Sequence, residues 1–252
     1  MWNDLQTDQY EGMIAETVTM RGYDDERLHA YLSRPLGAGP FPGIVLISHV
    51  PGWDELNREV ARRFSQHGFI TLCPNIYQRF GEGTPEEVAG RAREVGMAPD
   101  TTVIGDVGGA LDYLKSMPQS NGKVGVIGMC SGGRHAFLAG CMVQGIDAVV
   151  DCWGGNVVQA KVTPSQPVAP IELTAQLGCP MIGIFGNDDQ HPSPAEVDQH
   201  EAALKAAGKD YQFYRYDGAG HAIWNYARDS YRPEASMDSW DKVLAFFEAQ
   251  LT

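Results

Sequence analysis

The chain has 252 residues, of which 43% are hydrophobic, a size and composition that suit a single α/β domain over residues 1–252 with a full core. Its formal net charge of −13 argues against nucleic acid and anionic membranes as partners. Residues 1–5 lack a basic or apolar leader, and no stretch is apolar for long enough to span a bilayer. The five cysteines include no Cys-x-x-Cys pair, so we expect free thiols in a soluble, cytoplasmic protein.

The predicted elements begin with an antiparallel β-hairpin in the first thirty-five residues, where polar and apolar positions alternate around a turn at residues 22–25. Strands are then expected at 43–48, 69–73, 124–127, 148–150, 181–185 and 211–216, helices at 55–67, 102–117, 194–207 and 237–249, and a loop at 159–176. Nearly continuous apolar strands that alternate with helices predict a mostly parallel central sheet with helices on both faces and the hairpin at one edge. Ligands of such sheets bind at the carboxyl ends of the strands.

The most informative stretch is residues 128–132 (Gly-Met-Cys-Ser-Gly), which follows an apolar strand and opens a helix. This is the context of the Gly-x-Ser-x-Gly nucleophile turn, with Cys130 in place of serine. The nucleophile of such a turn has strained backbone, so its close neighbours must lack a Cβ atom, as Gly128, Gly132 and Gly133 do. The helix N-terminus favours the thiolate form of Cys130. The alternative is a glycine-rich turn around an inert, buried cysteine.

Two later strands end in residues that can assist a thiol. Asp188 and Asp189 follow one strand, and His221 follows the next. The chain order of thiol, carboxylate and imidazole is that of α/β-hydrolases. The histidine would act as general base and then acid, while the carboxylate orients it. The Gly-x-x-Asp spacing from Gly186 favours Asp189 as this carboxylate, with Asp188 as a cap of the turn.

The backbone N–H groups of Val50 and Ser131 are the expected oxyanion hole, since Pro51 has no N–H to donate. We find no metal-ligand spacing and no phosphate-binding glycine loop, so neither a metal nor a cofactor is expected. Four aromatic side chains near these motifs could line an apolar pocket or could equally pack in the core. They are Trp53, Tyr77, Trp153 and Trp224.

From about residue 15 to its C-terminus, the chain resembles the dienelactone hydrolase family of α/β-hydrolases. The resemblance is carried by residues 43–52, 73–77 and 121–125, the Gly-x-Cys-x-Gly-Gly turn, Gly186-x-x-Asp189 and Ala219-Gly220-His221. It implies a Cys130–Asp189–His221 triad that hydrolyses a small-molecule lactone or ester. A cysteine nucleophile separates this family from most esterases of the same fold.

The sequence departs from the family pattern at two places. Characterised dienelactone hydrolases carry a glutamate just after the first central strand, where this chain has His49. The loss of that negative charge is expected to leave the Cys130 thiol more reactive at rest. The family also binds the substrate carboxylate with two arginines. Arg79 matches one of them, but Asn225 stands at the position of the other, which weakens bidentate capture.

A thiolate attacks carbonyl carbon readily, but it also leaves the tetrahedral intermediate more easily than an ordinary alkoxide does. The sequence therefore predicts substrates with good leaving groups, namely lactones and enol or otherwise activated esters, and a thioester acyl-enzyme. Two alternatives stay open. One is a redox-responsive or ligand-binding protein that uses Cys130 as a sensor, and the other is an acyltransferase with the same triad. A homo-oligomer is compatible with the sequence.

Overall fold

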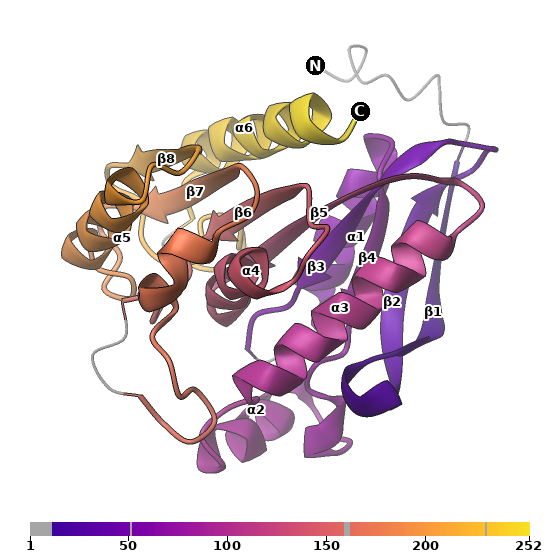
Figure 1. The fold of residues 1–252 in the computed structure, drawn as a ribbon, viewed down its shortest axis with the longest axis horizontal. Coiled ribbons are helices and arrows are strands. Elements are labelled where there is room, and N and C mark those ends of the chain that lie inside the picture. Colours follow the sequence, from indigo (N-terminus) through magenta and orange to yellow (C-terminus); the bar gives the residue numbers. More distant parts are fainter. Residues whose placement is uncertain (1–11, 51, 159–161, 230) are drawn as a thin grey trace.

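The structure, a computed structural model, describes residues 12–50, 52–158, 162–229 and 231–252. In these residues one sheet has eight strands in the order β1-β2-β4-β3-β5-β6-β7-β8 (Figure 1). The strands are β1 (Met13–Arg21), β2 (Arg27–Pro35), β3 (Phe41–Ile47), β4 (Ile70–Pro74), β5 (Ser120–Met129), β6 (Ala148–Cys152), β7 (Met181–Gly186) and β8 (Tyr211–Tyr216). Strands β3 to β8 run parallel and β2 is antiparallel to both of its neighbours, so the predicted sheet with an antiparallel edge is confirmed.

Helices cover both faces of the sheet (Figure 1). The α-helices of the two faces are α1 (Glu55–Gln66), α3 (Asp100–Ser116), α4 (Ser131–Met142), α5 (Pro194–Ala206) and α6 (Pro233–Leu251). A hydrophobic core lies on each face of the sheet. Strand β3 contributes to both cores, because its side chains are buried and point alternately to opposite faces. Ile44 and Leu46 belong to the core under α1 and α6, whereas Val45 and Ile47 belong to the core under α3 and α4.

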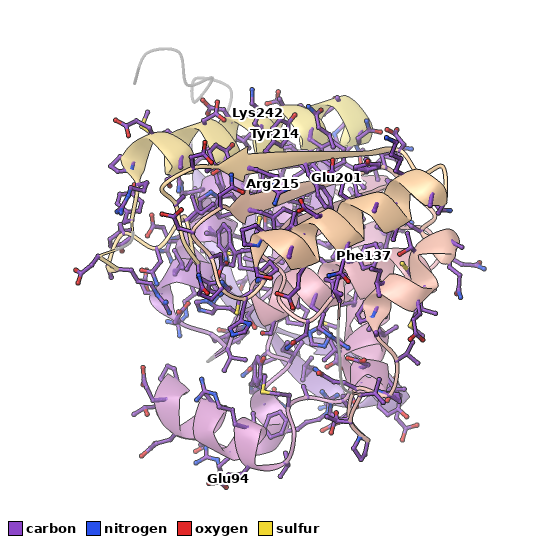
Figure 2. All side chains as sticks on the ribbon, turned by 90° about the vertical axis from the view of Figure 1, so that its left-hand side faces the viewer. Glu94, Phe137, Glu201, Tyr214, Arg215 and Lys242 are labelled. Atoms are coloured by element: carbon purple, nitrogen blue, oxygen red, sulfur yellow. The ribbon has the colours of Figure 1, made fainter. Side chains whose placement is uncertain are left out.

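The outer strand β8 has the same alternation, as Figure 2 shows at Tyr214 and Arg215. The Nζ atom of Lys242, on α6, lies 5.6 Å from the centre of the Tyr214 ring. The Arg215 guanidinium instead donates to the Asp198 carboxylate on α5. These adjacent residues therefore attach β8 to a helix on each face.

The sequence analysis missed one helix, α2 (Pro85–Glu94). Its start carries a recognisable signal, a capping box in which Thr84 and Glu87 exchange hydrogen bonds. The apolar face is short, because its buried residues are Val88, Ala89 and Ala92. In the expected loop at 159–176, the structure has a 3-10 helix, η5 (Pro170–Gln176), while residues 159–161 lie outside the described residues.

The carboxyl ends of the parallel strands lie at one edge of the sheet, where the loops after β3, β4, β5, β7 and β8 meet. A short 3-10 helix, η4 (Gln78–Phe80), and then α2 follow β4 at this edge (Figure 1). Among the helices of the described ranges, none is both long and apolar enough to cross a membrane.

Candidate active site

Cys130 joins β5 to α4 with φ 56° and ψ −120°, a conformation that L-residues rarely adopt. The neighbouring glycines make this turn possible. A Cβ atom at Gly128 would lie 1.9 Å from the carbonyl oxygen of Gly132, and one at Gly132 would lie 2.2 Å from that of Ile47. The close packing of the first turn of α4 on β3 and β5 therefore requires glycine at both positions.

All five cysteines are free thiols, and Cys130 differs from the others in its surroundings. Burial raises the pKa of Cys73, Cys141 and Cys179 to about 12, and it also raises the pKa of Cys152 well above its ordinary value. Cys130 is half-buried and lies close enough to His221 to raise the pKa of its imidazole. It is thus the thiol that is both accessible and next to an imidazole.

A carboxylate in the loop after β7 forms a hydrogen bond with a histidine in the loop after β8. The Nδ1 atom of His221 lies 2.7 Å from Oδ2 of Asp189, which is only 4% exposed. The other Asp189 oxygen accepts the backbone N–H of His191 at 2.9 Å. Asp188 is exposed, and its backbone N–H donates to the carbonyl oxygen of Ala219 at 2.9 Å. Of the two aspartates, Asp189 is therefore the partner of His221.

The pKa of His221 depends on two neighbouring side chains, Asp189 and Cys130. Burial by itself would lower the pKa of the imidazole, but hydrogen bonds to Asp189 and Cys130, together with their charges, raise it to about 9. With this pKa, the imidazole of His221 is protonated at neutral pH.

The two backbone N–H groups that the sequence analysis expected to form the oxyanion hole follow neighbouring strands of the sheet. Ser131 begins α4 directly after the thiol, and Val50 follows β3, the strand whose Ile47 pairs with Gly128 of β5. No oxygen of the described residues accepts a hydrogen bond from either N–H. The neighbouring Pro51 lies outside the described residues.

Behind Cys130, the side chains of Arg134 and His135 of α4 are buried. Both bind the carboxylate of Asp100 at the start of α3, Arg134 through two N–H groups and His135 through Nε2 at 3.2 Å. This pairing attaches α4 to α3.

Over the described ranges, no group of three or more His, Cys, Asp and Glu side chains is arranged to hold a metal ion.

Of the four aromatic candidates, Tyr77 lies beside the nucleophile, with its hydroxyl 3.4 Å from Oγ of Ser131. Trp153 and Trp224 are 1% and 2% exposed and pack edge to face, with ring centres 5.5 Å apart. The Trp224 indole N–H donates to Ser239 of α6. Both tryptophans therefore pack in the core, and their burial does not support a role in lining a substrate pocket. Trp53 is half-buried and lines a cavity with Tyr77.

The sequence model of the dienelactone hydrolase family matches residues 28–251. The chain belongs to this family. A putative carboxymethylenebutenolidase of Methylorubrum extorquens is 31% identical over 239 residues, which cover 94% of this chain and 81% of the relative. A probable 2-oxo-3-(5-oxofuran-2-ylidene)propanoate lactonase of Bradyrhizobium sp. is 28% identical over 244 residues, or 95% of this chain and 98% of the relative.

Solved structures give the same assignment for the fold. The crystal structure of a putative dienelactone hydrolase from Klebsiella pneumoniae matches with a TM-score of 0.87 and 26% identity, and the match covers 94% of this chain and 99% of that one. The protein therefore has the α/β-hydrolase fold of the family, as the sequence predicted.

His49, the first departure from the family pattern, is 9% exposed and belongs to an ion pair. Its Nε2 atom lies 2.6 Å from Oδ2 of Asp54, the N-cap of α1, whose other oxygen accepts the N–H of Asn57. Burial tends to raise the pKa of Asp54, but the hydrogen bond and charge of His49 lower it. Sequence reasoning did not single out Asp54, although an aspartate directly before a helix is a recognisable capping signal.

Arg79, the other residue matched to the family, pairs with two carboxylates of the protein. Its guanidinium donates to both oxygens of Asp106, at 2.7 and 3.0 Å, and to Glu26 at 2.7 Å. The Asp106 side chain is fully buried and also accepts the backbone N–H of Tyr23. Arg79 therefore neutralises a buried carboxylate of α3, and three of its five N–H donors are engaged within the protein.

Proposed function

We propose that this member of the dienelactone hydrolase family hydrolyses lactones or activated carboxylic esters, with Cys130 as nucleophile, His221 as acid and base, and Asp189 as the orienting carboxylate. The observation that carries the proposal is the place of His221, whose Nδ1 atom lies 2.7 Å from the Asp189 carboxylate and whose imidazole lies close enough to the thiol for its pKa to be raised by it. The substrate class is supported by the butenolidase and lactonase names of its relatives.

In the first half of the reaction, the Cys130 thiolate attacks the carbonyl carbon, and the carbonyl π electrons move to oxygen. The N–H groups of Val50 and Ser131 donate to this oxyanion. When the intermediate collapses, the bond to the leaving oxygen breaks, and that oxygen takes the proton from Nε2 of His221. The product of this half is a thioester on Cys130.

In the second half, His221 removes a proton from water, which attacks the thioester carbonyl. The carbon–sulfur bond breaks, the carboxylic acid leaves, and the thiolate–imidazolium pair is restored. Because sulfur is expelled more easily than an ordinary alkoxide, the first half needs an enolate, a phenolate or a strained lactone oxygen as leaving group. We therefore expect simple alkyl esters and amides to be poor substrates.

The test is hydrolysis of 4-nitrophenyl acetate together with mass spectrometry of the protein during turnover. The wild type is expected to turn over and to carry an acetyl group on Cys130. Cys130→Ala should lose both signals while its circular dichroism spectrum is unchanged, and Cys130→Ser should be impaired. Cys130→Ala with wild-type turnover would overturn the proposal.

The same assay separates this proposal from the alternatives. A redox-responsive or binding protein would show no turnover before or after iodoacetamide treatment. An acyltransferase would convert added alcohols to acetate esters in preference to forming acetic acid, which product analysis measures directly.

A further inference from the structure

The loop between β3 and α1 carries Val50, one of the two expected oxyanion-hole donors, and three polar side chains bind one another around it. The loop starts directly against the nucleophile turn. A Cβ atom at Gly132 would lie 2.2 Å from the carbonyl oxygen of Ile47 and 3.0 Å from that of Ser48. A shift of this loop would therefore change the position of the Val50 N–H group relative to Cys130.

The first contact comes from His49, the residue directly before Val50. The His49 side chain is buried, and its Nε2 atom lies 2.6 Å from Oδ2 of Asp54, the N-cap of α1. Asp54 is itself fixed by the helix, because its other oxygen accepts the backbone N–H of Asn57 at 3.0 Å. The imidazole is therefore anchored to the start of α1.

The second contact comes from Asn57, in the first turn of α1, and reaches the loop after Val50. The Nδ2 atom of Asn57 donates to the carbonyl oxygen of Gly52 at 2.8 Å and to Oδ1 of Asp54 at 2.7 Å. We call the side chains of His49, Asp54 and Asn57 the loop network.

Stability by itself does not explain an asparagine at position 57. The Asn57 side chain is fully buried, and its Oδ1 atom accepts no hydrogen bond from the described residues. A buried polar atom without a partner costs free energy, and an apolar residue of similar size would avoid this cost. The contribution that an apolar residue could not make is the N–H group that Asn57 directs at the loop.

Tyr77 supports the same loop from β4. A Cβ atom at Gly52 would lie 3.1 Å from Cδ2 of the Tyr77 ring. The Tyr77 hydroxyl lies 3.4 Å from Oγ of Ser131, whose backbone N–H is the other expected donor. The ring therefore contacts both segments of the expected oxyanion hole, and the loop network holds the segment that carries Val50.

We propose that the loop network positions the Val50 N–H group for the oxyanion, so that its three side chains are positioning residues for the reaction. The inference rests on the proposed function. Val50 lies between two anchored points, the His49 side chain and the Gly52 carbonyl group, and its N–H is therefore oriented before the substrate binds. A donor that is already oriented stabilises the oxyanion without reorganisation. The loop network thus acts on the attack at the carbonyl carbon and not on the formation of the thiolate.

The experiment compares two reactions of Cys130 that differ in their need for an oxyanion hole. Hydrolysis of 4-nitrophenyl acetate passes through an oxyanion, whereas alkylation by iodoacetamide takes place at a saturated carbon and forms none. Asn57→Leu introduces no charge and removes the hydrogen bond to Gly52. In this variant kcat/KM for hydrolysis should fall about tenfold or more, mainly through kcat, since loss of a whole oxyanion donor costs about 10²–10³-fold.

The rate constant for alkylation should stay close to that of the wild type in Asn57→Leu. It is taken from the plateau of the pH profile, where the thiol is fully ionised, so that a shift in the pKa of the thiol does not enter the comparison. Equal losses in hydrolysis and alkylation would overturn the inference, because they would show that the variant disturbs the nucleophile itself.

Asp54→Ser is the second variant. Serine still accepts the Asn57 N–H as an N-cap, but it is too short to reach His49. Hydrolysis should again fall more than alkylation. The matched control is Ser65→Ala, since Ser65 is a buried polar residue of the same helix that donates to the carbonyl oxygen of Ala61 and does not touch the loop. This control should keep both wild-type rates. Hydrolysis at the wild-type rate in Asn57→Leu or in Asp54→Ser would overturn the inference.

Hydrogen exchange, followed by mass spectrometry, tests the loop without hydrolysis. The amide protons of residues 49–54 should exchange about fivefold faster in Asn57→Leu and Asp54→Ser, because a hydrogen bond that holds the loop is lost, and at the wild-type rate in Ser65→Ala. Unchanged exchange in the first two variants overturns the inference. A wild type that hydrolyses no ester, with a loop that exchanges faster in these variants, would contradict the proposed function and support the loop network, so the two failures are distinguishable.

Discussion

The imidazole of His221 and the carboxylate of Asp189 meet at 2.7 Å between Nδ1 and Oδ2, although the two residues are 32 positions apart in the chain. The geometry that brings them together is that of adjacent parallel strands, since β7 and β8 pair up to Gly186 and Tyr216, directly before the two loops. The strand ends therefore deliver both side chains to the edge of the sheet that holds Cys130.

Asp189→Asn is expected to lower kcat about 10⁴-fold, because an amide in this position stabilises the wrong tautomer of the imidazole. Asp188→Asn is the matched control, since the Asp188 side chain is exposed, and it should change kcat by no more than a few fold. The kcat of each variant is measured with 4-nitrophenyl acetate. A larger loss in Asp188→Asn would assign the carboxylate to that residue.

The protonation of His221 should be visible directly. Its pKa is raised to about 9, so between pH 6.5 and 9 the fold retains a proton that a free histidine has lost. The resulting stabilisation is complete below pH 6.5 and disappears as the pH rises through 9. NMR titration of the imidazole carbon-bound protons should give this midpoint in the wild type and a lower one in Asp189→Asn. Equal midpoints would show that Asp189 does not influence the imidazole.

The His49–Asp54 pair leads to a prediction about the thiol. His49→Glu would restore the carboxylate that the family carries at this position, and its negative charge should move the midpoint of iodoacetamide alkylation of Cys130 to higher pH. His49→Gln should move it less. Asp54→Asn keeps the helix cap and removes the charge that binds His49, and so it separates capping from electrostatics. Superimposable alkylation profiles would show that His49 does not affect the nucleophile.

Arg79 is expected to matter for stability and not for substrate binding. Arg79→Met leaves the fully buried Asp106 carboxylate without its partner, which should lower the free energy of unfolding by about 3 kcal/mol. Urea denaturation measures this loss. The KM for a mono-4-nitrophenyl ester of a dicarboxylic acid should be unchanged in the folded variant. A rise in that KM with stability unaffected would return Arg79 to the substrate site.

The Asp151 carboxyl leads to a second prediction about the pH dependence of folding stability, and here the cause is burial. Burial raises the pKa of this fully buried carboxyl from 3.8 to about 7, against a single hydrogen bond from the Gly154 N–H. Ionisation therefore destabilises the fold increasingly as the pH rises from about 4 to 7. Relative to wild type, Asp151→Asn should gain about 2 kcal/mol of stability between pH 5.5 and pH 8.5. A pH-independent difference in urea denaturation would contradict this.

Much of the protein could be predicted from local patterns in the sequence. The turn around Cys130 is readable because its backbone strain admits only glycine at Gly128 and Gly132, and the strands are readable because buried parallel strands are continuously apolar. The Gly-x-x-Asp spacing from Gly186 also favoured Asp189, the aspartate that meets His221 in the structure. In each case the determining contacts are local, or they follow from the regular arrangement of strand ends.

The pairing of charges was decided by the tertiary structure alone. Nothing local to Arg79 indicates that Asp106 and Glu26 bind its guanidinium, since these residues lie 27 and 53 positions away. In the same way, Trp224 is buried against Trp153 and against Trp240 of α6, contacts that its neighbours in the sequence do not indicate. An ion pair depends on which surfaces meet in space, and residue type and spacing do not encode that. The sequence by itself therefore determined the fold and the candidate nucleophile, whereas tertiary packing decided which charged and aromatic side chains pair with one another.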